Sequence, residues 1–186
     1  MIIEGLMTTR NADGSMNLAP MGPIVDEQLS SFLFRPYNSS RTFANLQRER
    51  QGVFHVIDDV LLFAQAITDT LPRQPETFSA QVIQGKVLSA ACRWYELAVT
   101  QIDDRQPRTE IQTQILHIGH LRDFFGFNRA KHAVIEAAIL ASRRGLLPHE
   151  ELLQQFAALR TPVEKTAGPR EREAFALLET FVRQTG

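Results

Sequence analysis

Residues 35–42 read Arg35-Pro36-Tyr37-Asn38-Ser39-Ser40-Arg41-Thr42, between a predicted strand and a predicted helix. The first N–H groups of a helix have no partner within it and carry a partial positive charge, so a helix start attracts anions. Ser39, Ser40 and Thr42 add hydroxyl donors, while Arg35 and Arg41 add guanidinium groups that pair with phosphate through two hydrogen bonds. The segment therefore predicts a site for a phosphate monoester. The alternative is that a serine only caps the helix and the arginines face solvent.

A second segment, Asn17-Leu18-Ala19-Pro20-Met21-Gly22-Pro23, combines two prolines with a glycine. Proline has no N–H to give to a strand ladder, and both residue types hold the backbone in a defined course. The free N–H and C=O groups of such a segment suit the polar edge of a planar ligand. Taken alone, the segment is better explained as a rigid connecting loop.

The first 127 residues predict a mainly β domain. The cluster at residues 11–15 has Asp-Gly at its centre, which is typical of a hairpin turn. Residues 109–118 alternate with period two, as a strand with one drier face does. Residues 82–102 are long for one strand, and the small residues at 89–91 suggest a bend in it. The predicted strands cover residues 2–10, 16–21, 29–35, 52–58, 82–102 and 109–118, and two short helices cover 39–50 and 59–68.

From residue 128 the pattern becomes helical. Asn128 can cap a helix that runs to about Arg144 and ends at Gly145, and Pro148 and Pro169 begin two more helices. The sequence therefore predicts a β-barrel domain over residues 1–127 and a three-helix extension over residues 128–186.

Composition limits the classes of function. The chain has 186 residues with 20 Lys+Arg and 21 Asp+Glu, a net charge of −1, and residues 128–186 carry 9 basic and 7 acidic side chains. A near-neutral chain does not bind nucleic acid by bulk charge, so none is expected. No apolar run is long enough to span a bilayer and the N-terminus does not resemble a signal peptide, so a cytoplasmic location and no membrane contact are expected. Arginine makes up 17 of the 20 basic residues, a bias that genome composition explains as readily as anion binding.

Protein-based catalysis has little support in the sequence. A single cysteine, Cys92, excludes an intrachain disulfide and a cysteine-rich zinc site. His117 and His120 are three residues apart near the end of a strand, which turns them to opposite faces, so no metal site is expected. The sequence contains neither a nucleophile-elbow motif nor a dinucleotide-binding glycine motif. Catalytic residues therefore stay unassigned.

An ordered series of segments resembles an uncharacterised family of the FMN-binding split barrel, or flavin reductase-like, superfamily. The series comprises residues 5–11 (GLMTTRN), 17–23 (NLAPMGP), 35–36 (RP), 39–46 (SSRTFANL), 53–59 (VFHVIDD) and 127–138 (FNRAKHAVIEAA). The resemblance implies an FMN-binding split barrel that forms a homodimer, with a helical C-terminal extension.

The resemblance also implies roles for individual residues in holding FMN. The phosphate is expected at Ser39, Ser40, Arg41 and Thr42, with Arg35 nearby, and the flavin ring along Ala19, Pro20, Met21 and Gly22. Thr9, Arg10 and Asn45 are expected as supporting contacts.

Two functions remain open at this point. The first is an FMN-dependent oxidoreductase of unknown substrate, in which FMN supplies the chemistry and a reduced nicotinamide is a candidate electron donor. The second is a flavin-binding or interaction protein without turnover, in which the three helices dock a partner or cover the ring.

Overall fold

The computed structural model describes residues 1–71 and 74–184; residues 72–73 and 185–186, the last two within the expected extension, lie outside the description. The chain forms two compact units. Unit 1 consists of Met1–Ile57 and Pro75–Phe124, and unit 2 consists of Asp58–Gln74 and Phe125–Gly186.

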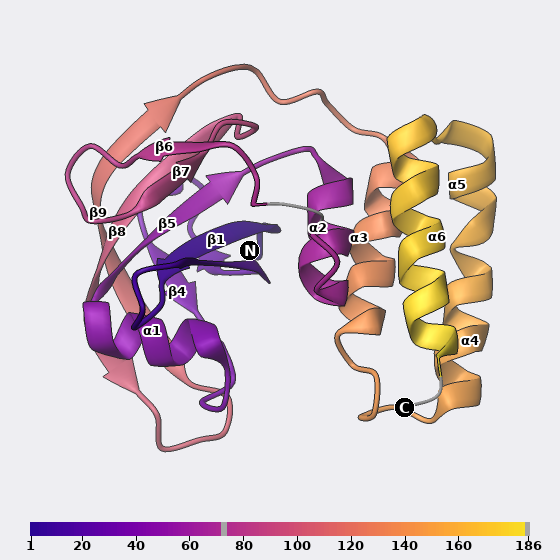
Figure 1. Cartoon of the computed structure of the whole chain (residues 1–186), viewed down its shortest axis with the longest axis horizontal. Helices are drawn as coiled ribbons and strands as arrows, with labels where there is room; N and C mark the ends of the chain where they lie inside the picture. The colour runs from indigo at the N-terminus through magenta and orange to yellow at the C-terminus, as the bar shows by residue number, and fades with distance from the viewer. Residues whose placement is uncertain (72–73, 185–186) are drawn as a thin grey trace. The chain divides into compact units, whose positions relative to one another are not determined.

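Unit 1 is built on a curled, antiparallel sheet of seven strands in the order β2-β1-β5-β8-β9-β4-β3 (Figure 1). A separate hairpin of β6 and β7 accompanies it. The strands are β1 (Gly5–Arg10), β2 (Met16–Met21), β3 (Ile24–Val25), β4 (Phe32–Phe34), β5 (Gln51–Val56), β6 (Thr77–Ser79), β7 (Lys86–Leu88), β8 (Arg93–Asp103) and β9 (Glu110–His120).

The predicted N-terminal hairpin is present as β1 and β2. Asn11 N donates to Ser15 O at 2.8 Å and closes the turn, and Gly14 occupies it with φ +85°, a conformation that glycine adopts without steric cost. The residues before β1 pair with the opposite edge of the sheet, since Val25 N donates to Met1 O at 2.8 Å. These bonds close the curled sheet into a split barrel.

The interior of the barrel is aromatic. Phe32 and Tyr95 lie 4.8 Å apart between ring centroids, and Phe34 and Phe54 lie 5.7 Å apart. Met7, Leu97 and Ile111 complete the same buried cluster. Burial of this apolar surface is the main force that holds the strands together.

Two predicted strands differ in extent from the observed ones. The strand expected at residues 82–102 is two strands, β7 and β8, separated by a turn in which Ala91 N donates to Leu88 O at 3.1 Å. The strand expected at residues 29–35 shortens to β4, because the Asp26 carboxylate accepts hydrogen bonds from Ser30 and Ser31 and folds the preceding residues into a turn.

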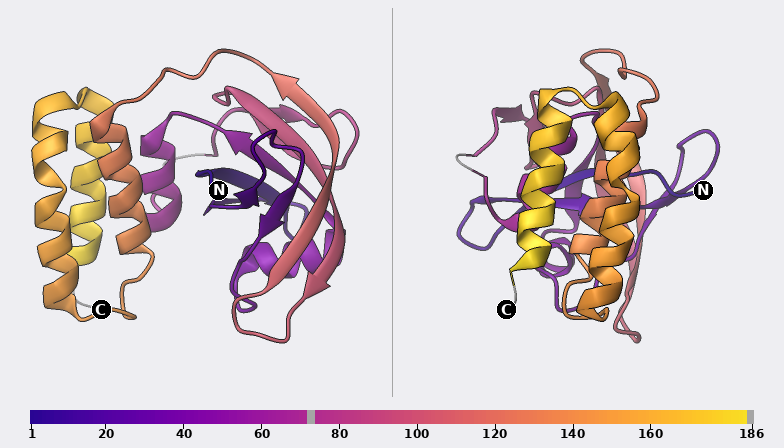
Figure 2. Two further views of the ribbon diagram at one scale, coloured as in Figure 1. Left: turned by 180° about the vertical axis from the view of Figure 1, so that it is seen from behind. Right: turned by 90° about the vertical axis from the view of Figure 1, so that its right-hand side faces the viewer.

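Helix α1 (Arg41–Glu49) belongs to unit 1, whereas α2 (Val60–Thr68) belongs to unit 2 together with the C-terminal helices. The expected boundary at residue 127 assigned α2 to the barrel, but its apolar residues Val60, Leu61 and Ala64 are buried in the core of unit 2. Residues 128–184 hold four helices rather than the expected three, since the second expected helix is divided at Leu159. These helices are α3 (Arg129–Ala141), α4 (His149–Ala158), α5 (Arg160–Thr166) and α6 (Pro169–Arg183), drawn in orange to yellow in Figure 2.

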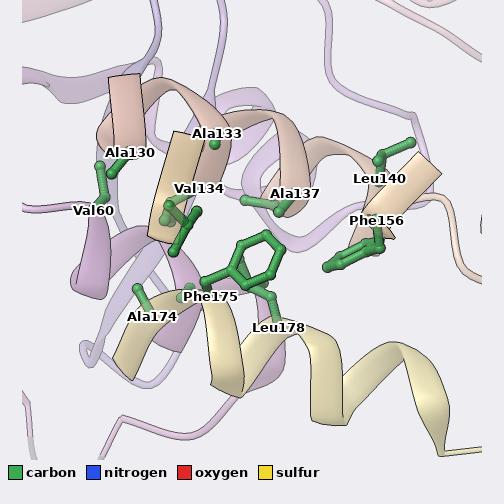
Figure 3. Packing of buried hydrophobic residues seen from close by; sticks show 14 of the residues in the cluster. Val60, Ala130, Ala133, Val134, Ala137, Leu140, Phe156, Ala174, Phe175 and Leu178 are labelled. Carbon is green, nitrogen blue, oxygen red and sulfur yellow. The ribbon is translucent and has the colours of Figure 1, made fainter. Parts of the chain in front are cut away.

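The core of unit 2 is packed from small and large side chains (Figure 3). Alanines of α3, such as Ala133 and Ala137, let the neighbouring helices approach, and Phe156 of α4 and Phe175 of α6 meet with ring centroids 5.9 Å apart. None of the helices in the described ranges is long and apolar enough to cross a membrane.

Candidate functional site

The start of α1 is capped by a serine and leaves backbone amides unpaired. Ser40 is the N-cap, and its hydroxyl oxygen accepts a hydrogen bond from Phe43 N at 3.1 Å. The backbone N–H groups of Arg41 and Thr42 have no acceptor in the part of the chain that the structure describes. They are the unpaired amides that a helix start offers to an anion.

Basic side chains accompany these amides. Arg41 is exposed at the first position of α1, two residues after the exposed Ser39, and the half-buried Arg35 directly follows the end of β4. Arg35, Ser39, Ser40 and Arg41 thus lie between the end of β4 and the first turn of α1, and their contact with a phosphate stays a prediction.

Arg108 is a further basic residue at this segment that the sequence analysis missed. Its Nε donates to Arg35 O at 3.2 Å, and its guanidinium carbon lies 5.4 Å from the centroid of the Tyr37 ring. Asn38 N donates to Pro107 O at 2.9 Å and strengthens the link between the two segments. A separation of 73 residues between Arg35 and Arg108 leaves no local signal for this pairing.

The candidates Thr9, Thr42 and Asn45 are brought together, but inside the unit. They are 5%, 4% and 2% exposed, and Asn17, which the sequence analysis did not single out, is 8% exposed beside them. Asn17 Nδ2 donates to Thr9 Oγ1 at 3.1 Å and to Thr42 Oγ1 at 3.2 Å, and Asn45 Nδ2 donates to Thr9 Oγ1 at 3.0 Å. These residues connect β1, β2 and α1 through buried hydrogen bonds, which fix the position of the helix start.

Arg10 does not join this group. Its guanidinium donates to Gln84 Oε1 at 2.7 Å, in the loop after β6, and its backbone carbonyl accepts a hydrogen bond from Arg48. The structure therefore assigns the Arg10 side chain to the loop rather than to the start of α1.

The segment expected beside a flavin ring lies on β2, which is an edge strand. Ala19, Pro20 and Met21 are half-buried, and they pair with β1 on one side only. The outer edge of β2 has no partner strand in residues 1–71 or 74–184. Gly22 follows, where a Cβ atom would lie 2.8 Å from a Glu4 carboxylate oxygen, so a side chain there would require the Glu4 carboxylate to move.

Two buried titratable groups in unit 1 have structural partners. His55 is fully buried, with Nδ1 3.0 Å from Leu6 O and Nε2 accepting from Leu88 N at 3.1 Å. Burial lowers the pKa of His55 to about 4, so the ring is neutral at pH 7. Glu96 accepts hydrogen bonds from the backbone of Gln81 and Val82 and from the Trp94 indole. His55 thus links β1 to the end of β7, and Glu96 holds the loop between β6 and β7.

Across the described ranges, no group of three His, Cys, Asp or Glu residues lies close enough together to hold a metal ion. The site thus offers amides, hydroxyls and guanidinium groups, which suit a phosphate rather than a cation.

Comparison with known proteins gives two family models that together match most of the chain. The model described as "Protein of unknown function (DUF447) N-terminal domain" matches residues 3–122, and "Protein of unknown function (DUF447)" matches residues 128–180. A search of the curated proteins finds no match.

Solved structures share the fold at low sequence identity. The FMN-bound protein MM1853 from Methanosarcina mazei superposes with a TM-score of 0.83 at 22% identity, covering 97% of this chain and 94% of that one. The 2-nitrobenzoate 2-nitroreductase NbaA from Pseudomonas fluorescens gives 0.54 at 16% identity over 63% of this chain and 64% of that one. The styrene monooxygenase flavin reductase from Pseudomonas putida S12 gives 0.52 at 10% identity over 64% of this chain and 81% of that one.

Proposed function

The chain belongs to the DUF447 family, whose fold is the flavin reductase-like split barrel, and from this starting point we propose that it is an FMN-dependent oxidoreductase. The observation that carries the proposal is the start of α1, where the N–H groups of Arg41 and Thr42 have no acceptor in the described residues and the exposed Arg41 side chain occupies the first helical position. The FMN-bound state of the Methanosarcina mazei protein supports the same cofactor here.

The donor set of the site fits FMN. A phosphate monoester needs several donors and positive charge, which Arg41 N, Thr42 N and the Arg41 guanidinium supply. The free edge of β2 at Ala19–Met21 supplies backbone groups for the polar edge of the ring. Both elements are held by the buried bonds between Asn17, Thr9 and Thr42.

FMN would supply the hydride or electron transfer when bound, and the protein binds and orients it. Arg41 and the start of α1 anchor the phosphate end, and β2 directs the ring end. No protein nucleophile is required for this chemistry, and the buried His55 and Glu96 are not placed to act as acid or base on a ligand.

We propose that the protein works as a homodimer. Leu116, Ile118, Leu121 and Phe124 of unit 1 are 46%, 52%, 45% and 49% exposed, and together they make an apolar stretch along β9 and the residues after it. Exposed apolar side chains that follow one another along a strand and the segment after it favour association with another protein surface.

Anaerobic reduction of the FMN-loaded protein tests the enzyme proposal. Reduced nicotinamide should bleach the flavin absorbance, and the rate should saturate because donor and flavin must form a complex first. Dithionite is the control that shows whether the flavin is reducible at all.

Bleaching by dithionite, with no bleaching by either NADH or NADPH, would contradict a nicotinamide-dependent enzyme. That result would favour the second function, a flavin-binding protein without turnover.

A further inference from the structure

The buried amide of Asn17 connects the two elements of the proposed FMN site. Asn17 lies on β2, the strand proposed beside the ring, and Thr42 lies in the first turn of α1, at the proposed phosphate site. Asn17 Nδ2 donates to Thr42 Oγ1 at 3.2 Å, and both residues are more than nine-tenths buried. A buried hydrogen bond of this kind defines the orientation of both side chains.

The direction of the hydrogen bonds decides what the threonine hydroxyls can still do. An asparagine NH₂ group only donates, so each threonine oxygen that it contacts acts as an acceptor. Thr9 Oγ1 accepts from both Asn17 and Asn45, and Thr42 Oγ1 accepts from Asn17. The hydroxyl proton of each threonine is therefore left to donate elsewhere.

The other helical threonines show where such a proton usually goes. Thr68, Thr166 and Thr180 each donate to the carbonyl oxygen four residues earlier, at 2.9, 2.7 and 2.9 Å. Thr42 is the second residue of α1, so Asn38, four residues earlier, lies before the N-cap Ser40 and offers no helical carbonyl for the same bond. The Thr42 hydroxyl belongs to the same helical turn as the unpaired N–H groups of Arg41 and Thr42.

We propose that Asn17 is a positioning residue for phosphate recognition: its amide occupies the acceptor side of the Thr42 hydroxyl and turns that hydroxyl into a donor for the phosphate of FMN. Asn17 itself does not touch the phosphate. The inference rests on the proposed FMN binding and adds a specificity-determining contact to it.

The consequence is measurable as the preference for FMN over riboflavin, since riboflavin lacks the phosphate. A hydrogen bond to a charged group contributes about 10- to 100-fold in affinity. Thr42→Val removes the hydroxyl at nearly constant shape and should lower the FMN-to-riboflavin affinity ratio about tenfold or more. Asn17→Leu should lower the ratio by a similar factor while Thr42 is still present.

The double variant Asn17→Leu/Thr42→Val tests whether Asn17 affects phosphate binding through the Thr42 hydroxyl. If Asn17 acts through Thr42, the double variant has the same ratio as Thr42→Val alone. The proposal would be overturned if the FMN-to-riboflavin affinity ratio of the double variant fell by the product of the two single-variant factors. An equal loss of FMN and riboflavin binding in Asn17→Leu would also overturn it. Asn11→Ala is the matched control, because Asn11 accepts from Asn45 in the same cluster but makes no bond to Thr42; its ratio should stay unchanged.

Asn17→Asp keeps the shape if Asn17→Leu does not fold. The carboxylate accepts instead of donating, so it draws the Thr42 proton towards residue 17, and the FMN-to-riboflavin ratio should fall at least as far. An unchanged ratio in Asn17→Asp would overturn the proposal. Wild-type protein is titrated first: absence of FMN binding there refutes the proposed cofactor, whereas normal FMN binding with an unaffected ratio in the variants refutes only the role of Asn17.

Discussion

Replacing His55 should change how the stability of the protein depends on pH. The imidazole is buried between β1 and the residues at the end of β7, with Leu6 O and Leu88 N as partners. The second of these bonds requires an unprotonated Nε2, and burial lowers the pKa from 6.5 to about 4. Between pH 4 and pH 6.5, His55 is therefore protonated in the unfolded chain but largely unprotonated in the folded chain.

The size of the effect follows from the two pKa values. Each pKa unit is worth about 1.36 kcal/mol, so the folded state should lose about 3 kcal/mol of unfolding free energy through His55 as the pH falls from 7 to 4. The stabilisation is complete above pH 6.5 and decreases steadily below it. For a domain of ordinary stability this is a large fraction of the total.

Urea denaturation followed by the fluorescence of Trp94, the single tryptophan, measures the effect at pH 7, 6, 5 and 4. His55→Gln loses one of the two hydrogen bonds and is less stable than the wild type at pH 7, but the difference between them should shrink by about 3 kcal/mol at pH 4. Other titrating groups cancel in the difference. Exposed His149→Gln is the control, and its curve should run parallel to the wild type. A constant difference between wild type and His55→Gln across the range would refute the reasoning.

Three further outcomes follow from the structure. Arg41→Ala should weaken FMN about 10- to 100-fold in an equilibrium titration and leave riboflavin nearly unchanged; equal loss for both ligands would show that Arg41 does not contact the phosphate. Gly119→Ala should destabilise unit 1 by about 1–3 kcal/mol or more in urea denaturation, since its Cβ would lie 2.0 Å from the Trp94 ring; wild-type stability would contradict this close approach. Light scattering at micromolar concentration should give twice the chain mass of 21.0 kDa, and a monomer mass would exclude the proposed dimer.

The local parts of the fold could be predicted from the sequence. The turn at residues 11–15 and the start of α1 depend on residues within a few positions of each other, such as Gly14 and the N-cap Ser40. The order of elements, strands first and helices from residue 128, was likewise correct because periodicity and capping are local signals. The resemblance to the split-barrel family is confirmed by the family matches and the fold.

The parts that depend on distant contacts could not be predicted. The place of α2 in unit 2 follows from Val60 and Ala64 packing with residues of α3 and α6, which no local pattern encodes. Sheet register decides which strand residues face a neighbour, so Asn17 and Thr42, 25 residues apart, meet only once β1, β2 and α1 are assembled.

The candidate site likewise contains residues placed by local signals and residues placed by distant contacts. Ser40 caps α1 and Arg41 is exposed, as the capping alternative predicts, and their contact with a phosphate stays a prediction. Thr42 and Asn45 lie in the expected helix on the face of α1 that packs on the sheet, and both side chains take part in the buried hydrogen bonds to Asn17 and Thr9. Arg108 reaches the site through a loop contact that a separation of 73 residues hides from any sequence pattern.

Equilibrium titration of the purified wild-type protein with FMN and with riboflavin, followed by flavin fluorescence, tests the central proposal most directly. Binding of FMN at least tenfold tighter than riboflavin is expected, because the unpaired amides of Arg41 and Thr42 and the Arg41 guanidinium act on the phosphate alone. Failure to bind FMN, or equal affinity for the two flavins, would contradict the assignment of the start of α1 as the phosphate site.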